Sequence, residues 1–120
     1  MMIAFDTTER GIVRVRLESG AKVVRRTRKM FADDLLNFTH LLIKKNRPSL
    51  IAVVNGPGAF SATRNGVAIA NALAYGWGVS IAAISKEQFD SPLPITRKGS
   101  ASVVVVYGSE PNITKKKERL

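Results

Sequence analysis

Three residues that could take part in chemistry, Asp6, Thr7 and Thr8, follow an apolar run at residues 2–5 that predicts a short strand. A carboxylate and two hydroxyls beside backbone amides could hold a hydrated magnesium phosphate. The same side chains can instead close a β-turn through hydrogen bonds to the backbone. We favour the turn, because 120 residues are the size of one domain. A nucleotide bound by one domain alone would stay open to water, and its base would not be held.

A second candidate is the glycine turn Gly56, Pro57 and Gly58, which follows another apolar run. It lacks the spacing and the lysine of GxxxxGK[ST], which excludes a Walker-type phosphate loop. The amides at the start of the following helix make a weak anion site at best, and Pro57 removes one donor. We therefore expect a conformational role for this turn.

Catalytic constellations are missing from the sequence. There is no HExxH, no GxSxG and no cysteine, so neither a zinc-ligand set nor an activated nucleophile for peptide hydrolysis can be assembled. Asp33 and Asp34 are explained by a helix start, and His40 has no partner residue to orient it. The sequence predicts no catalytic residue, no metal and no cofactor.

These residues are positioned by a central unit, residues 50–85, that predicts a strand, a glycine turn, a helix and a strand. Residues 50–54 are apolar at every position, as in a parallel strand covered on both faces. Ser61 is expected to cap a helix over residues 62–75, and Gly76 and Gly78 are expected to end it. Residues 79–84 then return as a parallel strand through a right-handed crossover.

The flanking segments extend this unit. Residues 11–18 alternate, with Val13 and Val15 on one face and Arg14, Arg16 and Glu18 on the other, which predicts a half-buried antiparallel strand. Residues 21–26 can pair back as the third strand of a meander, and residues 31–45 have the helical repeat. Residues 86–99 predict a turn of helix followed by a loop, and the valine-rich residues 101–107 predict a last strand.

Both main helices carry more apolar or small-residue surface than one sheet can cover. The first has a wide apolar arc, and the second has small residues at four-residue spacing, which lets another backbone approach closely. We expect packing on the sheet on one side and contact with another protein on the other; the alternative is that the alanine-rich helix only packs closely on its own sheet. The predicted partner contacts are Phe31, Leu35, Phe38, Leu42, Arg64, Val67, Ala70, Asn71 and Ala74.

The second helix and its glycine turn carry a family resemblance. NGPGAFSATRNGVAIANALAYGWGV, residues 55–79, is similar to the GPGSFTGLRIGVATAKGLALGLGI signature of the TsaB (YeaZ) family. IAFDTTE at residues 3–9 resembles the family's opening ILAIDTSTE, and AAISKEQF at residues 82–89 resembles its GVSSLE. The resemblance covers roughly residues 1–90. The chain departs from the signature at Ala59, Ser61 to Thr63 and Asn65, and 120 residues cannot accommodate the second lobe of the usual family member.

The resemblance implies an α/β fold, a single ribonuclease H-like lobe of the actin-like (ASKHA) superfamily. We expect this lobe, with a mixed sheet in the order β-β-β-α-β-α-β, over residues 1–110, and a basic, flexible tail over residues 111–120. In that superfamily an Asp-containing first turn binds metal and phosphate, and a glycine turn approaches the nucleotide. By resemblance, Asp6, Thr7, Thr8, Gly56 and Gly58 look like remnants of these turns.

The resemblance also implies a function. TsaB binds the catalytic subunit TsaD through the helices of its first lobe and supports transfer of a threonylcarbamoyl group to adenosine 37 of tRNA, which makes threonylcarbamoyladenosine (t6A). We therefore expect a non-catalytic scaffold that forms a heterodimer with a TsaD-type subunit, reaches tRNA through that complex, and forms a homodimer when the partner is absent.

Charge leaves two alternatives open. Nineteen basic and nine acidic residues give a formal net charge of +10, which favours polyanions such as tRNA. The cluster Arg25, Arg26, Arg28 and Lys29 can be a solvated sheet edge or, with Lys44, Lys45, Arg47 and the tail, the contacts of an RNA-binding module. The third hypothesis is a small nucleotide-binding enzyme that uses Asp6. The lack of cysteine fits the cytoplasm, and we see neither a signal peptide nor a membrane helix.

Overall fold

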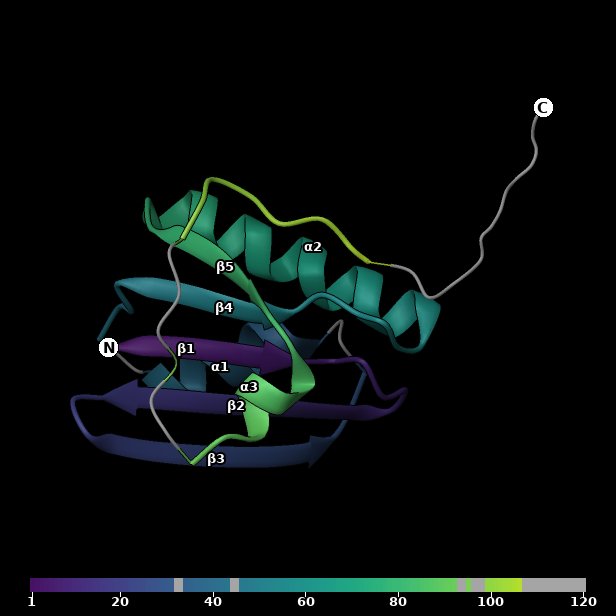
Figure 1. Ribbon diagram of the computed structural model, residues 1–120, viewed down its shortest axis with the longest axis horizontal. Helices are drawn as coiled ribbons and strands as arrows, with labels where there is room; N and C mark the ends of the chain where they lie inside the picture. Colours follow the sequence, from purple (N-terminus) through teal and green to yellow (C-terminus); the bar gives the residue numbers. More distant parts are fainter. Residues whose placement is uncertain (32–33, 44–45, 93–94, 96–98, 107–120) are drawn as a thin grey trace.

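The chain folds around a five-stranded sheet with the strand order β3-β2-β1-β4-β5 (Figure 1). The computed structural model describes residues 1–31, 34–43, 46–92, 95 and 99–106, and within α1 it leaves out the side chains of residues 42 and 43. The elements are β1 (Met2–Asp6), β2 (Ile12–Ser19), β3 (Lys22–Lys29), α1 (Leu35–Ile43), β4 (Leu50–Val54), α2 (Phe60–Trp77), β5 (Ser80–Ile84) and α3 (Lys86–Asp90). This order confirms the predicted mixed α/β lobe. The predicted tail, residues 111–120, lies outside the described residues.

The centre of the sheet is β1, which pairs antiparallel with β2 and parallel with β4. Ile3 lies beside Ile51, and Ile51 in turn lies beside Ile81 of the parallel strand β5. Every residue of β1 is buried, because layers cover both faces of the sheet. The predicted crossover from β4 through α2 to β5 is confirmed.

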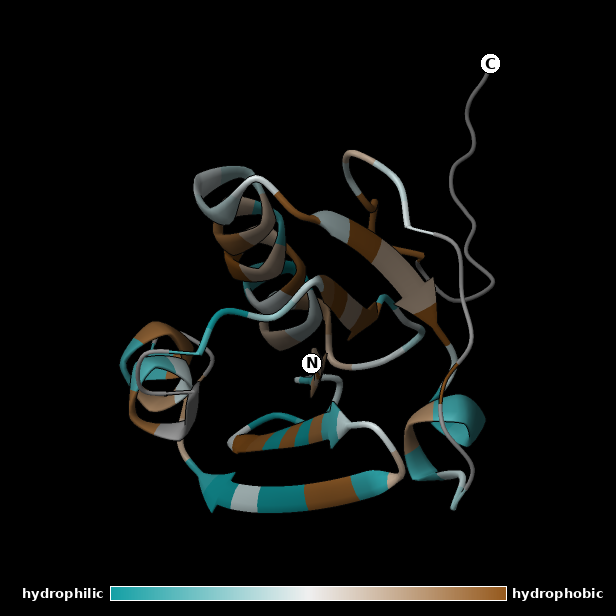
Figure 2. Ribbon diagram, turned by 90° about the vertical axis from the view of Figure 1, so that its left-hand side faces the viewer, coloured by the Kyte–Doolittle hydropathy of each residue, from teal (hydrophilic) through white to brown (hydrophobic). Residues whose placement is uncertain are grey.

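Two layers cover the sheet, as Figure 2 shows from the side. On one face α1 and α2 pack over a core that includes Phe5, Phe38 and Leu73. On the other face α3 packs Phe89 against a smaller cluster that includes Ile84. None of the helices in the described part of the chain is long and apolar enough to cross a membrane.

Each end of α2 lies two residues beyond the predicted range of 62–75. The helix begins at Phe60 after Ala59, which makes no side-chain cap bond, so the predicted cap at Ser61 is wrong. The Ala59 N–H donates to Thr8 O at 2.7 Å, and this bond fixes the helix start to the turn after β1. At the other end Gly76 lies inside the helix, and Gly78 caps it with a left-handed φ of 68°, as such a cap requires.

The first helix is shorter than predicted. Strand β3 continues to Lys29, and the Met30 N–H still donates to Gly11 O at 3.0 Å. Since the backbone is paired with the sheet up to this point, Phe31 lies before the helix, which begins at Leu35. The positions of Asp33, Lys44 and Lys45, which were expected at the helix ends, lie outside the described residues.

The predicted last strand is also wrong. Ser100 makes one isolated antiparallel bridge with Ile81. The residues after it, 101–106, form no strand and run as an extended segment along α2 (Figure 1). The Asn71 side chain donates from Nδ2 to Val103 O at 2.7 Å and accepts from the Val103 N–H at 2.9 Å. This amide on the helix satisfies the backbone groups of Val103 that a strand would pair, and Val103 and Val105 pack against the core beside α2 instead of extending the sheet.

Candidate functional site

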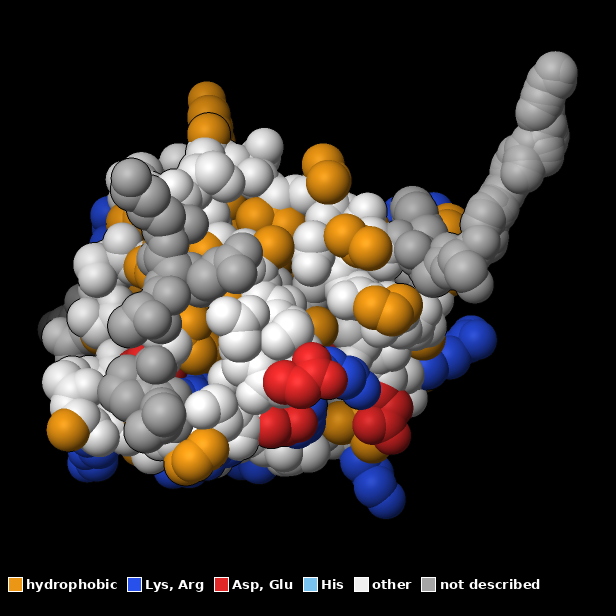
Figure 3. Space-filling view, viewed as in Figure 1, with side chains coloured by type: hydrophobic (Ala, Val, Ile, Leu, Met, Phe, Trp, Pro, Cys, Tyr) orange, Lys and Arg blue, Asp and Glu red, His pale blue; other side chains and the backbone are white. Residues whose placement is uncertain are grey.

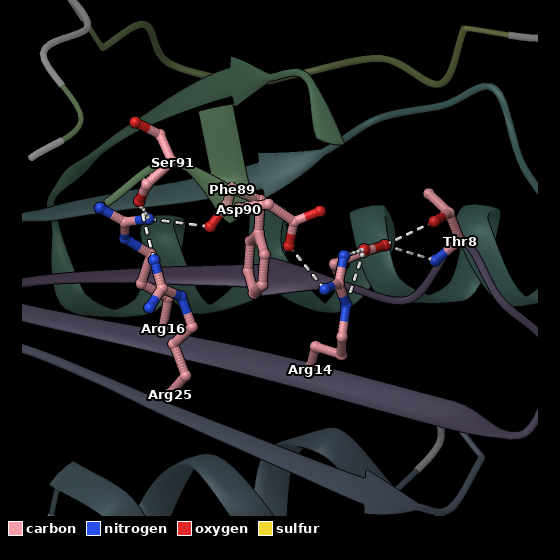
Figure 4. Close-up of polar contacts among 8 residues, drawn as sticks. Thr8, Arg14, Arg16, Arg25, Phe89, Asp90 and Ser91 are labelled. Carbon is pink, nitrogen blue, oxygen red and sulfur yellow. Dashed lines mark hydrogen bonds and ion pairs between the residues drawn. The ribbon is translucent and has the colours of Figure 1, made fainter. Parts of the chain in front are cut away.

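The turn after β1 uses its polar groups internally. Asp6 is only 3% exposed, and its Oδ1 accepts from the Thr8 N–H at 2.9 Å and from the Thr8 hydroxyl. Its Oδ2 accepts from Arg14 Nε at 3.1 Å and from Arg14 Nη2, as Figure 4 shows. The Thr7 hydroxyl donates to Ala62 O at 2.9 Å. The prediction that Asp6 and Thr8 close a turn is confirmed, and Arg14 adds a partner that the sequence did not suggest.

The electrostatics of this turn keep Asp6 ionised. Burial raises the pKa of Asp6, but hydrogen bonds from Thr8 and Arg14 outweigh burial and hold the pKa below its ordinary value of 3.8. Burial likewise lowers the pKa of Arg14, while its bonds to Asp6 and Asp90 more than compensate and leave that pKa raised. The carboxylate is thus charged and saturated with hydrogen bonds from its own chain.

The glycine turn packs directly against the first turn. A Cβ on Gly58 would lie 2.5 Å from Thr8 Cβ, and one on Gly66 of α2 would overlap the Thr7 hydroxyl. Gly56 has φ +123° and lies against the carbonyl of Val106. The two predicted phosphate turns therefore meet, and their glycines permit close backbone packing, in line with the conformational role expected from the sequence.

The cavity beside the first turn is smaller than the pockets that usually bind ligands of drug size. A cavity of about 180 Å³ is lined by residues that include Thr7, Glu9, Arg10, Ser61 and Asn65. Ligand pockets for molecules of drug size are typically about 300–1,000 Å³. In the described residues no three His, Cys, Asp or Glu side chains gather as a metal site would require. The geometry thus gives the hypothesis of a nucleotide-binding enzyme little support.

The charged face of β2 is buried, which the sequence analysis missed. Arg16 is fully buried and donates from Nε to Glu18 Oε2 at 2.7 Å and from Nη1 to Phe89 O at 2.8 Å. It also donates to Ser91 O, and Arg14 Nη1 donates to Asp90 Oδ1 at 2.6 Å (Figure 4). These bonds hold α3 on the sheet, so the row predicted to face water lies under a helix.

Five of the predicted partner contacts lie in the chain's own core. Burial removes Leu35 and Phe38 of α1, together with Val67, Ala70 and Ala74 of α2, from any surface that a partner could reach. Asn71 is engaged with Val103, and the Leu42 side chain lies outside the described residues. The prediction that these five side chains face a partner is therefore wrong, because the apolar arc of each helix faces the sheet.

Other residues of the same helices are exposed. Tyr75 is 89% exposed and Leu41 is 75% exposed. The exposed side of α2 also carries a stripe of small residues, and a Cβ on Gly76 would meet nothing within 4 Å. Since His40 of α1 and Trp77 of α2 make an edge-to-face contact at 6.4 Å, the two helices lie side by side. We call this surface the outer helix face; it consists of Leu36, Leu41, Ala68, Ala72, Tyr75 and Gly76.

Two of the predicted contacts, Phe31 and Arg64, are exposed, as expected. Phe31 precedes α1, and the Arg64 guanidinium stacks over the ring of Phe60 with its Cζ 4.9 Å from the ring centroid. Phe60 itself is 55% exposed at the start of α2.

The predicted basic cluster is exposed on β3 but divided between two faces. Arg25 and Lys29 lie beside Arg16 and Ile12 of β2, on the α3 face, where Arg25 Nη2 donates to Ser91 O at 2.7 Å. Arg26 and Arg28 lie on the opposite face, and Arg28 stacks over Phe38 with its Cζ 5.4 Å from the ring centroid. Figure 3 shows Lys and Arg side chains along this rim of the molecule.

The sheet order, with α1 and α2 on one face, defines a single ribonuclease H-like lobe. The model of a family described as TsaD, tRNA N6-adenosine threonylcarbamoyltransferase, matches residues 31–88. A crystal structure of an uncharacterised Pseudomonas aeruginosa protein with similarity to peptidase YeaZ has a TM-score of 0.62 and 23% identity, covering 70% of this chain and 42% of that one. YeaZ from Pseudomonas aeruginosa has the same TM-score and identity, covering 70% of this chain and 43% of its own.

The predicted resemblance is thus confirmed: the chain is TsaB/YeaZ-like in its fold. It spans less than half the length of either solved structure. No curated protein matches it.

Proposed function

We propose that the chain is a non-catalytic partner subunit that binds a TsaD-type threonylcarbamoyltransferase through the outer helix face. In this role it supports the formation of t6A in tRNA. The match of residues 31–88 to the TsaD family model and the YeaZ-like fold support a connection with this machinery.

The observation that carries the proposal is the exposure of the outer helix face. Tyr75 and Leu41 present large apolar side chains to solvent on two adjacent helices. On the exposed side of α2 the small residues Ala68, Ala72 and Gly76 leave the helix backbone open to close approach. Exposed apolar surface of this kind is typical of sites where another protein docks.

A scaffold role is also supported by the state of the residue that a nucleotide site would use. Both carboxylate oxygens of Asp6 accept hydrogen bonds from Thr8 and Arg14. A metal ion could coordinate Asp6 only by breaking these bonds. The turn thus connects the end of β1 to the start of α2 through hydrogen bonds.

Co-expression with a TsaD homologue tests the proposal. Ala72→Arg places a long charged side chain in the middle of the outer helix face, whereas Ala21→Arg makes the same change at an exposed turn between β2 and β3. We expect the unmodified chain and Ala21→Arg to co-purify with the homologue, and Ala72→Arg to lose it. Equal recovery with both variants would count against this face as the interface.

The same pair of variants tests self-association. Without the transferase we expect the chain to form a homodimer through the outer helix face, since exposed apolar surface favours an isologous contact. Sedimentation velocity should then show a dimer for Ala21→Arg and a monomer for Ala72→Arg.

A further inference from the structure

Strand β3 forms one edge of the sheet, and the described part of the chain places no other strand beside it. The strand has eight residues, Lys22–Lys29, most of them exposed. An edge of this length presents a row of backbone N–H and C=O groups that can pair with an added strand.

The register identifies the outward-facing groups. In an antiparallel pair, alternate residues exchange hydrogen bonds with the neighbouring strand and the others point away from it. The Met30 N–H donates to Gly11 O, so the even-numbered residues face β2. The outward residues are then Val23, Arg25, Thr27 and Lys29.

Two arginines lie at this edge and bond to its carbonyls. Arg26 Nη1 donates to Arg25 O at 2.9 Å, and Arg28 Nη1 donates to Thr27 O at 3.1 Å. An incoming strand would offer its own N–H groups to these carbonyls. The guanidinium groups of Arg26 and Arg28 would then be released from these carbonyls and could contact the side chains of the added strand.

The charge of the edge indicates the kind of strand that fits. Five of the eight residues of β3 are basic and none is acidic. The basic side chains alternate between the two faces of the sheet, with Arg25 and Lys29 on one face and Arg26 and Arg28 on the other. A second copy of β3 would be repelled, whereas a strand with carboxylates on both of its faces would be attracted along its whole length.

We propose that the β3 edge binds an extended acidic peptide segment of a partner protein, which adds a sixth strand to the sheet. The split of the basic residues favours a strand over RNA, because a phosphate chain lying on one face would reach only half of them. This site is separate from the outer helix face and does not depend on its function.

The test uses the full chain and a fluorescent eight-residue peptide with five glutamates, placed at both odd and even positions so that both faces of the strand carry carboxylates, and with valine or threonine at the other three positions. We expect saturable binding by fluorescence anisotropy. A peptide of the same sequence, N-methylated at alternate amides on its pairing edge, keeps its charge but cannot pair with the β3 backbone. Its affinity should be at least about tenfold lower, the loss expected from a few net hydrogen bonds.

Variants of the protein separate the charge from the backbone contribution. Arg26→Glu with Arg28→Glu should abolish binding, while Arg47→Glu with Arg64→Glu, an equal charge change at exposed residues on other elements, should weaken it much less. Thr27→Pro removes one outward N–H and leaves the hydrogen bonds between β3 and β2 in place. It should lower the affinity for the unmodified peptide but not the affinity for the methylated one.

Three results would overturn the proposal: no saturable binding of the unmodified peptide, equal binding of the methylated peptide, or tighter binding of a single-stranded RNA of equal charge. The last result would instead favour the basic cluster as an RNA contact.

Discussion

The two faces of the sheet are covered in different ways. On one face an 18-residue helix, α2, and the nine-residue α1 bury an apolar core. On the other, the five-residue α3 buries only Phe89 of its own residues and is held by Arg14 and Arg16. A face closed mainly by hydrophobic packing can leave its outer side for a partner, whereas a face that also depends on an ion pair and on hydrogen bonds to carbonyls uses its polar groups to stay closed.

The α3 face should therefore be the more sensitive to a single polar change. Arg16→Met removes the partner of buried Glu18 and of two carbonyls near α3, and we expect a loss of about 3–5 kcal/mol in the free energy of unfolding. Urea denaturation measures this loss. Adding Glu18→Leu removes the unpaired charge and should recover part of it. A loss below about 1 kcal/mol for Arg16→Met would show that apolar packing alone holds α3.

The stability contributed by the Asp6 turn between β1 and α2 should depend on pH. The pKa of Asp6 is held below 3.8, so the unfolded chain binds more protons in acid than the folded one. The contribution of Asp6 is then fully present above about pH 5 and is lost as the pH falls through its folded pKa. Asp6→Asn should cost about 1.5–3 kcal/mol at pH 7, as expected for hydrogen bonds to a charged group.

Urea denaturation at several pH values checks this. The difference between Asp6→Asn and the unmodified chain should shrink steadily between about pH 5 and pH 2. A difference that stays constant over this range would mean that the charge of Asp6 does not stabilise the fold.

Substitutions at two glycines of α2 allow a comparison of the inner side of the helix, at Gly66, with its outer side, at Gly76. Gly66→Ala would push a Cβ into Thr7 and should cost about 1–3 kcal/mol, the cost of overpacking. Gly76→Ala faces open space and should stabilise the isolated chain by up to about 1 kcal/mol through helix propensity. Thermal unfolding of both variants checks the pair, and a destabilised Gly76→Ala would show that the outer side is not open.

Much of the fold could be predicted from local pattern. The continuous apolar run at residues 50–54 and the glycine turn after it fix the crossover, and the TsaB-like signature covers the same stretch. The turn at Asp6 could also be predicted, because Asp and Thr side chains after a strand commonly form hydrogen bonds to nearby backbone groups.

The rest depended on contacts between residues far apart in the chain. The alternation of residues 11–18 cannot reveal that α3, some seventy residues later, contacts Arg16, or that the backbone of Ile95 contacts Glu18. Similarly, nothing local shows that Asn71 pairs with Val103 and draws the valine-rich segment onto α2. The interface residues were misassigned for a related reason: helical spacing identifies an apolar arc but does not show whether the chain's own sheet or a partner covers it.

Photo-crosslinking tests the central proposal, docking through the outer helix face, most directly. Tyr75, the most exposed large side chain of that face, is replaced by p-benzoylphenylalanine, and Ser19, exposed at the end of β2, is replaced in a control. Irradiation with a TsaD homologue should give a crosslinked heterodimer from position 75 and none from position 19. A crosslink from position 19 alone, or equal yields from both positions, would contradict the account.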